Sequence, residues 1–314
     1  MSSTLIVYES KYGFTESIAK KLSLILGPAR YTKASAFDGK KENYETIVIC
    51  TPIYSENVDE NIIKFVLKHK EWLKQKKVIL ICSCLAENNE NEYLKPLQDI
   101  IGESVLIQKT IGGELIIDKL TDSDYRLMKH FSEMTGFPLK DSITFDQNKF
   151  IDFALLIKEK KYEGKKVLEE KALKQFIDDF IQSHNTCTLA TGHGINVRAT
   201  PIEFTYYKDN IYFLSEGGEK YANLLMNPNV SIGIYDAYKS MSELSGMQIT
   251  GIAELIEIGS DEYIDVLKIN NLQIDNIISL PVSLNLIKIN IKKIEFLWSD
   301  FAKLKVDLKQ ILYK

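Results

Sequence analysis

The chain has 314 residues, 45% of them hydrophobic and 26% charged, and a formal net charge of −4. That length predicts two globular domains, and the slight acidic excess excludes the strongly basic surface that a nucleic-acid partner needs. The sequence has no run of about 18 uncharged apolar residues, and its first apolar segment, Leu5 to Tyr8, is too short for a secretion signal. We therefore expect a cytoplasmic protein that binds neither membrane nor nucleic acid.

The first half of the chain alternates short apolar runs with amphipathic stretches. These predict strands and helices over 4–10 (strand), 15–26 (helix), 45–54 (strand), 60–69 (helix), 76–85 (strand), 91–101 (helix) and 104–113 (strand). Strands that are apolar along their whole length are buried on both faces, which is typical of parallel sheets with helical crossovers. We expect an α/β doubly wound parallel sheet in the order βαβαβαβ.

Two more helices are predicted before the first domain ends. One spans about 118–140, with Gly136 and Pro138 as breakers, and the other lies at 151–161. A charged stretch with Gly164 follows, which is typical of a surface linker. The expected boundaries are therefore 1–158 for the first domain, 159–168 for the linker and 169–314 for the second domain.

The second half opens with an amphipathic helix, predicted at 169–183, and then changes period. Strand-like runs separated by turn signals are predicted at 187–191, 197–207, 210–216, 229–236, 247–258 and 286–298. One helical insertion interrupts them at 260–272. This spacing indicates an antiparallel β-barrel or sandwich.

Cysteine and histidine give no sign of a metal site. The sequence has four of each, which are Cys50, Cys82, Cys84, Cys187, His69, His130, His184 and His193. The spacing of Cys82 and Cys84 matches neither a zinc pair nor a CxxC motif, and the histidines form no HxxxH arrangement. We expect reduced thiols and no metal ion.

The segment Ser10-Lys11-Tyr12-Gly13-Phe14-Thr15 has the composition of a phosphate loop. It follows the first predicted strand and leads directly into an amphipathic helix. A phosphate needs backbone N–H donors from a tight turn, hydroxyl groups and the positive end of a helix dipole, and this segment supplies all three. The alternative is a plain strand-to-helix turn with Thr15 as its N-cap.

This segment resembles the phosphate loop of flavodoxins, S/T-x-T/Y-G-x-T before a helix, at every fixed position. The resemblance implies a flavodoxin-like domain that binds FMN. It also implies that two later loops wrap the isoalloxazine ring: Thr51, Pro52, Ile53 and Tyr54 in one loop, and Ser83, Cys84 and Leu85 in the other. Tyr54 would stack on the flavin, unless it is an ordinary surface tyrosine.

Residues of about 170–300 resemble the pyridoxamine 5′-phosphate oxidase-like split-barrel family. The resemblance rests on R-x-x-P from Arg198, S-x-x-x-x-K from Ser215 to Lys220, and N-P-x-V from Asn227. It implies an antiparallel split β-barrel that carries FMN, or in some branches deazaflavin or heme, usually at a dimer interface. By position, the backbone of Arg198, Ala199 and Thr200 would face the flavin ring, Ser215 and Lys220 would hold the phosphate, and Gln248 would approach the ring.

Several of these residues have plainer interpretations. Lys220 could be a solvated turn lysine, Arg198 could pair with a nearby carboxylate, and His193 could be a surface turn histidine. Phe296 and Trp298 could cover a cofactor or fill the core. A basic set that grips a vitamin phosphate is not identifiable near the C-terminus, so oxidation of pyridoxamine phosphate is disfavoured.

The leading hypothesis is an FMN-dependent oxidoreductase that exchanges electrons with a small-molecule or protein donor or acceptor and forms a homodimer through its barrel. A second FMN in the barrel is left open. One alternative is a heme-binding or heme-degrading barrel with His184 or His193 as ligand, fed by the flavodoxin-like part. The other alternative is a non-enzymatic flavin electron carrier or sensor.

Overall fold

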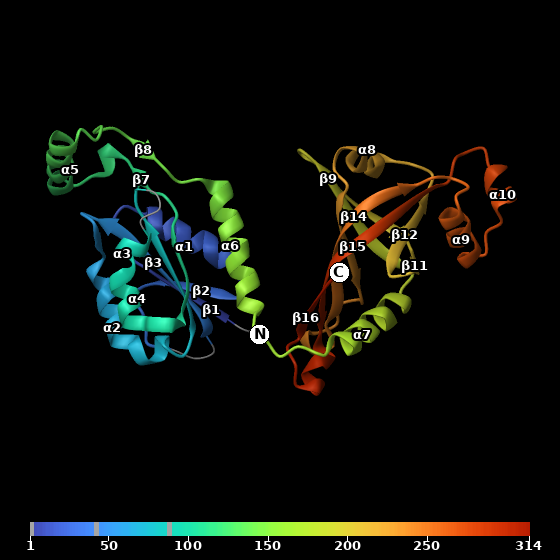
Figure 1. The fold of residues 1–314 in the computed structure, drawn as a ribbon, viewed down its shortest axis with the longest axis horizontal. Helices are drawn as coiled ribbons and strands as arrows, with labels where there is room; N and C mark the ends of the chain where they lie inside the picture. Colours follow the sequence, from blue (N-terminus) through green and yellow to red (C-terminus); the bar gives the residue numbers. More distant parts are fainter. Residues whose placement is uncertain (1–2, 41–43, 87–89) are drawn as a thin grey trace. The chain divides into compact units, whose positions relative to one another are not determined.

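The computed structural model describes residues 3–40, 44–86 and 90–314. Two compact units make up the chain, Met1–Gly164 and Lys165–Lys314 (Figure 1). Within the described residues, no helix is both long and apolar enough to span a bilayer.

The first unit is built on a parallel sheet. Its helices and strands are β1 (Ser3–Tyr8), α1 (Phe14–Ile25), β2 (Ala29–Lys33), β3 (Tyr44–Tyr54), β4 (Asn57–Val58), α2 (Glu60–Leu73), β5 (Lys77–Ser83), α3 (Glu90–Tyr93), α4 (Lys95–Ile101), β6 (Val105–Thr110), β7 (Glu114–Leu115), α5 (Asp122–Thr135), β8 (Ser142–Ile143) and α6 (Gln147–Tyr162). The strand order is β2-β1-β3-β5-β6, all parallel, with β4 folded back on β3. This is the flavodoxin-like order, and it confirms the predicted doubly wound sheet.

Two apolar layers enclose this sheet. Helices α1 and α6 cover one face, where Ile18 and Phe150 pack on Ile6, and α2 and α4 cover the other, where Phe65 packs near Leu5 (Figure 1). Side chains alternate across each strand, so a central strand such as β1 must be apolar at successive positions to fill both layers. The layers leave the carboxyl ends of β1, β3 and β5 at one edge.

The predicted order βαβαβαβ was incomplete. It lacks the edge strand β2, whose sequence ARYTK carries two cations and has no fully buried side chain. An edge strand is partly solvated, so it lacks the continuous apolar run that identifies a central strand. The predicted helix at 91–101 is also divided, into α3 and α4.

Between β6 and α6 the chain leaves the sheet. Strands β7 and β8 pair with each other as a separate two-stranded sheet, and α5 lies between them in sequence. Helix α5 begins after the N-cap Thr121 and ends at Gly136, within the helix predicted at 118–140. None of its side chains is buried in the core.

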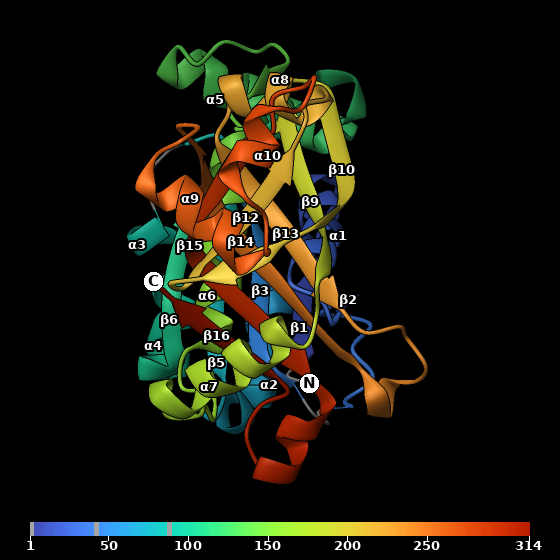
Figure 2. The same cartoon turned by 90° about the vertical axis from the view of Figure 1, so that its right-hand side faces the viewer.

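The second unit is a curled antiparallel sheet with helices at its rim (Figure 2). Its elements are α7 (Glu170–Gln182), β9 (Thr186–His193), β10 (Asn196–Glu203), β11 (Thr205–Tyr207), β12 (Asn210–Ser215), α8 (Glu219–Met226), β13 (Asn229–Tyr235), β14 (Ser245–Ile256), α9 (Asp261–Ile269), α10 (Ile274–Ile278), β15 (Asn285–Trp298) and β16 (Lys309–Tyr313). The order is β10-β9-β13-β14-β15-β12-β11, with β16 also on β15. This antiparallel curled sheet confirms the predicted split barrel.

Strand β15 explains how the barrel splits. One edge of β15 pairs with β14 along its length, while the other pairs with β12 through Leu286–Ile289 and with β16 through residues 293–297. A register shift between Thr250 and Gly251 bends β14 at the crossing. A Cβ on Gly251 would lie 2.5 Å from the Ile289 side chain, so this close approach requires glycine.

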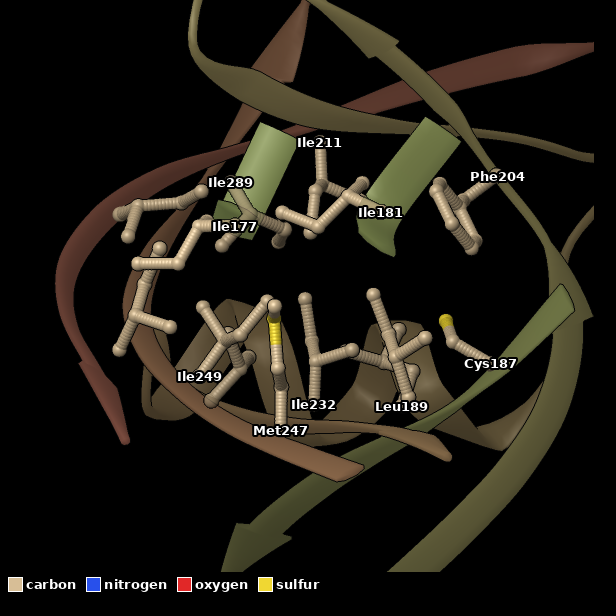
Figure 3. Close-up of a cluster of buried hydrophobic side chains, with 14 of the residues drawn as sticks. Ile177, Ile181, Cys187, Leu189, Phe204, Ile211, Ile232, Met247, Ile249 and Ile289 are labelled. Atoms are coloured by element: carbon tan, nitrogen blue, oxygen red, sulfur yellow. The ribbon is translucent and has the colours of Figure 1, made fainter. Parts of the chain in front are cut away.

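The barrel core is closed by α7. Figure 3 shows Ile177 and Ile181 of α7 among strand side chains that point toward one another, such as Ile232, Ile249 and Ile289. These five side chains are at most 1% exposed. The strong amphipathic pattern that predicted this helix therefore reflects its burial against the sheet.

Three features of the barrel were not predicted. The run predicted as one strand at 197–207 is broken at Phe204 into β10 and β11. Helix α8 occupies the segment expected to be a turn, and β16 follows a short 3₁₀ helix near the C-terminus. Helix α8 and strand β16 are short. A helix of about two turns or a strand of about five residues gives only a weak periodic pattern of apolar residues in the sequence.

Candidate functional site

The loop between β1 and α1 forms the first part of the candidate site. Gly13 adopts φ +88° as the N-cap residue of α1, and its N–H donates to Ser10 Oγ at 3.0 Å. No side chain caps α1, so the N–H groups of its first turn face the loop with the positive end of the helix dipole. The N-cap is therefore not Thr15, whose Oγ1 instead lies 2.8 Å from Ser83 Oγ.

A cavity of about 250 Å³ adjoins this loop. Three predicted loops meet around it, and the predicted residues that line it are Lys11, Tyr12, Phe14, Thr15, Pro52, Ile53, Tyr54, Ser83, Cys84 and Leu85. Ser10 and Gly13 belong to the same loop but do not line the cavity, and Thr51 is fully buried behind it. The convergence follows from the topology, because β1, β3 and β5 end at one edge of the sheet.

Tyr54 is held at the cavity edge. Its ring packs edge-on against Tyr12 with 6.2 Å between centroids, and its hydroxyl oxygen accepts the Lys11 N–H at 3.3 Å. Burial raises the pKa of the Tyr54 hydroxyl. The following residues, Ser55 and Glu56, both have positive φ, a conformation that non-glycine residues adopt at a cost in tight hairpins. Tyr54 is thus a positioned ring rather than a free surface tyrosine.

The fourth wall of the cavity comes from residues that the sequence analysis did not include. They belong to β7, α5 and the segment between them, and they are Glu114, Leu115, Ile116, Lys119, Leu120, Asp124, Leu127 and Met128. The sequence did predict an amphipathic helix at 118–140. An amphipathic pattern does not distinguish a helix on the open surface from one that lines a cavity, so it could not assign these residues to the site. Gly113 brings this wall close to the third loop, since a Cβ there would lie 2.8 Å from the Cys84 carbonyl carbon.

Asp124 joins the α5 wall to the phosphate loop. Its carboxylate lies 2.5 Å from Lys11 Nζ and accepts the Tyr12 hydroxyl. The Tyr12 oxygen in turn accepts the Thr121 N–H at 3.4 Å. The Lys11 and Tyr12 hydrogen bonds lower the pKa of Asp124, and the same contact raises the pKa of Lys11.

In the barrel, Lys220 is a buried cation on α8. It is 7% exposed, and its ammonium donates to the Gly217 carbonyl at 2.5 Å. Burial, with the Arg198 charge as a second cause, lowers the pKa of Lys220. Ser215 Oγ lies 3.4 Å from the Gly217 N–H, so Ser215 and Lys220 meet at one turn. Lys220 is therefore not a solvated lysine.

Arg198 and Thr200 lie on the core-facing side of β10. Arg198 pairs across the ladder with Thr191, and Thr200 pairs with the buried Leu189. The Arg198 guanidinium forms an ion pair with Glu219 at 2.5 Å, the carboxylate partner considered as its plainer role. Within the described residues, the buried Thr200 Oγ1 has no hydrogen-bond partner.

Two further buried polar groups lie beside these residues, and the sequence analysis missed them. Asn223 of α8 is 5% exposed and donates to Thr191 Oγ1 at 3.1 Å. Nothing in the sequence marks either residue, because Thr and Asn are common on exposed turns. Only the packing of α8 on β9 reveals that they belong to a buried polar cluster.

Gln248 is not close to that cluster within one chain. It is exposed on the outer face of β14, opposite Met247 and Ile249 in the core. Ala199 also points outward, and its row crosses Ala190 and Ser231 before it reaches β14, three strand spacings or about 14 Å away. The barrel residues implied by the family resemblance thus occupy both faces of the sheet.

The histidines and terminal aromatic residues also have definite places. Both ring nitrogens of His184 are engaged, Nδ1 2.8 Å from the Phe180 carbonyl and Nε2 3.3 Å from Asp236, and His193 is exposed at the end of β9. Phe296 is fully buried and Trp298 stacks on it with an interplanar angle of 10°. Phe296 therefore lies in the core, and the partly buried Trp298 packs against it.

The fold and the two residue clusters define a flavodoxin-like domain joined to a split barrel. Family models agree: that of the flavodoxin domain matches residues 5–140, and that of pyridoxamine 5′-phosphate oxidase matches residues 173–297. The chain therefore carries an N-terminal flavodoxin domain and a C-terminal pyridoxamine 5′-phosphate oxidase-like domain. Domains of both kinds commonly bind flavin.

Solved structures are similar to parts of the chain. They include HutZ, described as a heme storage protein, from Vibrio cholerae (21% identity, TM-score 0.33, 38% of this chain and 90% of that one). ChuZ from Campylobacter jejuni (18%, 0.38, 55% and 73%) and a putative pyridoxamine 5′-phosphate oxidase from Listeria innocua (23%, 0.32, 40% and 98%) are similar too. No curated protein matches the chain significantly.

Proposed function

We propose that the protein is an FMN-dependent oxidoreductase whose first domain holds FMN in the cavity beside the Ser10–Thr15 loop. One observation carries the proposal: loops from the ends of β1, β3 and β5 line a single cavity with an uncapped helix N-terminus at its edge. That arrangement suits a planar ring with a phosphate tail.

The residues of the cavity divide the work of binding. In this proposal the loop N–H groups bind the phosphate at the edge of the cavity, with the hydroxyl of Ser10 from the loop and that of Thr15 from the cavity wall. Tyr54 packs against the ring, and the α5 wall would keep water from the ring with apolar side chains such as Leu127. Lys11 and Tyr12 fix that wall through Asp124. FMN, when bound, supplies electron transfer by one-electron or two-electron steps.

The first test is the FMN content and affinity of Gly13→Ala beside Gly136→Ala. Both glycines have a left-handed backbone and open space for a Cβ, so each substitution adds a similar backbone strain of about 1–2 kcal/mol. Only Gly13 belongs to the phosphate loop beside the cavity. We expect Gly13→Ala to weaken FMN binding about tenfold or more, as backbone donors shift, and Gly136→Ala to bind like wild type. FMN bound equally by both variants, or by neither the variants nor wild type after reconstitution, contradicts the proposal.

A second flavin site in the barrel is the next candidate. Two observations favour it: the Lys220 ammonium on α8 is buried, and the buried Thr200 Oγ1 on β10 has no hydrogen-bond partner in the described part of the chain. A buried cation without a carboxylate partner is costly unless an anion joins it. In this proposal Ser215 and Lys220 hold the flavin phosphate, and the backbone of residues 198–200 approaches the ring. FMN stoichiometry tests it, since two FMN per chain must fall to one in Lys220→Ala.

The barrel is also proposed to form a homodimer. The β9–β10 hairpin exposes Ile195 (98%) and Val197 (82%), and Gln248 faces outward where only a second copy can carry it to a flavin on β10. Val197→Glu is expected to convert a dimer to a monomer in light scattering. A wild-type monomer at micromolar concentration excludes this arrangement.

Turnover separates an enzyme from a carrier. Steady-state oxidation of NAD(P)H with a quinone or dye acceptor is expected for the oxidoreductase, and it should fall in proportion to the FMN lost from Gly13→Ala. A protein that holds stoichiometric FMN but shows no turnover with any small-molecule pair is an electron carrier or sensor.

A further inference from the structure

One hydrogen bond joins the third loop of the cavity to the phosphate loop. Ser83 Oγ lies 2.8 Å from Thr15 Oγ1, although the two residues are 68 positions apart in sequence. Ser83 is the last residue of β5, Thr15 lies in the first turn of α1, and both line the cavity. The family resemblance places Ser83 beside the flavin ring, whereas its hydroxyl is bonded to the phosphate loop. The contact therefore points to a role at the other end of the ligand.

The alternation of side chains along β5 explains why these residues meet. Ile81 packs in the apolar layer that α1 and α6 cover, and Cys82 packs in the opposite layer. Successive side chains of a strand point to opposite faces, so Ser83 returns to the face that α1 covers. There the first turn of α1 presents Thr15. The hydrogen bond thus follows from the parallel sheet and not from the conformation of a surface loop.

This hydrogen bond is shielded from water. Thr15 is 3% exposed and Ser83 is 7% exposed. A buried hydroxyl that loses its partner incurs the cost of its desolvation, whereas a hydroxyl on the surface exchanges its partner for water. The bond between Ser83 and Thr15 is therefore a fixed part of the cavity wall, and it constrains the orientation of both hydroxyl groups.

A bound phosphate would fix the direction of this hydrogen bond. The phosphate of FMN is mostly a dianion at neutral pH, so its oxygens accept hydrogen bonds rather than donate them. A hydroxyl group has one O–H to donate and lone pairs with which to accept. When Thr15 donates its O–H to the phosphate, its bond with Ser83 therefore requires that Ser83 donate to Thr15 Oγ1. Such a chain strengthens its members, because each donor is polarised by the next.

The other hydroxyl of the phosphate loop has the same arrangement. Ser10 Oγ accepts the Gly13 N–H at 3.0 Å. An oxygen that accepts one N–H still has its own O–H to donate. In both Ser10 and Thr15, then, a second group of this chain supplies a donor to the oxygen and leaves the O–H for an anion. Gly13 has this function for Ser10, and Ser83 has it for Thr15.

We propose that Ser83 is a positioning residue for the phosphate, and that it raises the preference of the cavity for FMN over riboflavin. Ser83 acts through Thr15 and contacts neither the phosphate nor the ring. The location of the phosphate rests on the proposed function. The ligand class that this pair selects is a flavin that ends in a phosphate monoester, as opposed to the same ring without the phosphate.

The first measurement compares FMN with riboflavin, which has the same ring and no phosphate. Calorimetric titrations use the full-length protein in a Lys220→Ala background, which removes the proposed barrel site. Ser83→Ala is expected to weaken FMN binding about three- to tenfold, the worth of one hydrogen bond, and riboflavin binding less than about twofold. An equal loss for both flavins overturns the proposal, and so does no loss for either.

Ser55→Ala is the matched control. Ser55 lines the same cavity from the second loop, and among the described residues its hydroxyl makes no hydrogen bond to the phosphate loop. Its substitution should leave the ratio of FMN to riboflavin affinity as in wild type. A ratio that falls as far in Ser55→Ala as in Ser83→Ala overturns the proposal, because any hydroxyl of the wall would then have the same effect.

A double-mutant cycle tests whether Ser83 acts through Thr15. Thr15→Val removes the hydroxyl that Ser83 would orient. In the Thr15→Val protein, Ser83→Ala is expected to cause no further loss of FMN affinity, so the coupling equals the whole effect of Ser83→Ala alone. Thr15→Ser keeps the hydroxyl and should keep the dependence on Ser83. Losses that simply add overturn the proposal.

Misfolding and failure of the proposed function have separate readouts. Riboflavin binding shows that the cavity of a variant is intact, and Ser83→Cys, which keeps the size of the side chain but is a weak donor, gives a second route to the same loss of preference. Wild type that binds neither flavin refutes the proposed function and this inference with it. Wild type that prefers FMN, with the same preference in Ser83→Ala and Ser83→Cys, refutes the role of Ser83 alone.

Discussion

The flavodoxin cavity and the polar cluster of the barrel assemble their residues in different ways. In the first domain, parallel strands all end at one edge. Tyr54 and Cys84, which lie 39 and 69 positions after Thr15, therefore line the same cavity as Thr15. In the barrel, Arg198 lies on one face of the antiparallel sheet and Gln248 on the other, while Lys220 comes from helix α8. Parallel topology therefore gathers the residues of the cavity within one chain, while the residues considered for the barrel lie on both faces of its sheet.

The two regions also differ in how their lysine charges are paired. Lys11 at the cavity has a carboxylate partner in Asp124, whereas Lys220 in the barrel has a carbonyl partner and lies near a second cation, Arg198. Our proposal of an anion site in the barrel therefore predicts that the buried Lys220 charge costs stability in the absence of an anion, which the paired Lys11 does not. The four predictions below test this contrast.

The largest effect is expected from substitutions in the two separate cores. Ile49→Ala in the first domain and Ile249→Ala in the barrel should each cost about 2–5 kcal/mol, but only in the domain concerned. Each domain contains one of the two tryptophans, Trp72 and Trp298. Fluorescence unfolding of each substitution in Trp72→Phe and Trp298→Phe backgrounds therefore reports the domains separately. A single shared transition contradicts independent cores.

Removing the barrel cation should raise stability and lower anion affinity together. Lys220→Met is expected to stabilise the ligand-free barrel by about 1 kcal/mol, because an apolar side chain replaces a buried charge, while phosphate or FMN affinity at this site falls about 10–100-fold.

The pH dependence of the barrel's unfolding free energy also tests the burial of Lys220. The folded state lowers the pKa of Lys220, so the unfolded chain binds more protons between that lowered value and the ordinary lysine value. Wild-type stability should therefore rise with pH across that window, and Lys220→Met should lose the rise. Chemical denaturation at a series of alkaline pH values measures it, and a Lys220→Met barrel less stable than wild type contradicts the prediction.

A smaller effect is expected at the α5 wall. Asp124→Asn should speed FMN release about two- to fivefold, since a partly exposed ion pair is worth about 0.2–1 kcal/mol. Asp122→Asn removes a carboxylate from the same helix turn without touching the loop and should have no such effect. Stopped-flow release rates compare the two variants.

Low pH should speed FMN release in the same way as Asp124→Asn, because protonation removes the Asp124 charge. The pKa of Asp124 is lowered in the folded state, so its contribution is complete above the ordinary aspartate pKa and is lost as the pH falls through the lowered value. Release from wild type should quicken over that range, and release from Asp124→Asn should not.

The smallest effect is expected from Glu219→Gln. Freeing Arg198 from its ion pair should raise the phosphate affinity of the barrel about two- to threefold, with stability changed by less than about 0.5 kcal/mol, as for most exposed charges. Glu216→Gln, an exposed neighbour, is the matched control. Calorimetry with inorganic phosphate in a Gly13→Ala background isolates the barrel, and an unchanged or weaker affinity in Glu219→Gln means that Arg198 does not face the anion.

The sequence by itself determined both fold classes and the three loops at the cavity. Central strands such as β1 and β5 are apolar at successive positions, and a glycine between hydroxyl residues before a helix is a local pattern, so short-range information suffices for both. The sequence did not predict the edge strands β2 and β16, because both are partly solvated and lack a continuous apolar run.

Tertiary structure alone decided which residues share a site. Asp124 lies 113 positions from Lys11, and Asn223 lies 32 from Thr191, so no local pattern could pair them. Periodicity reports which side of an element is buried, but what it is buried against is set by packing between elements distant in sequence.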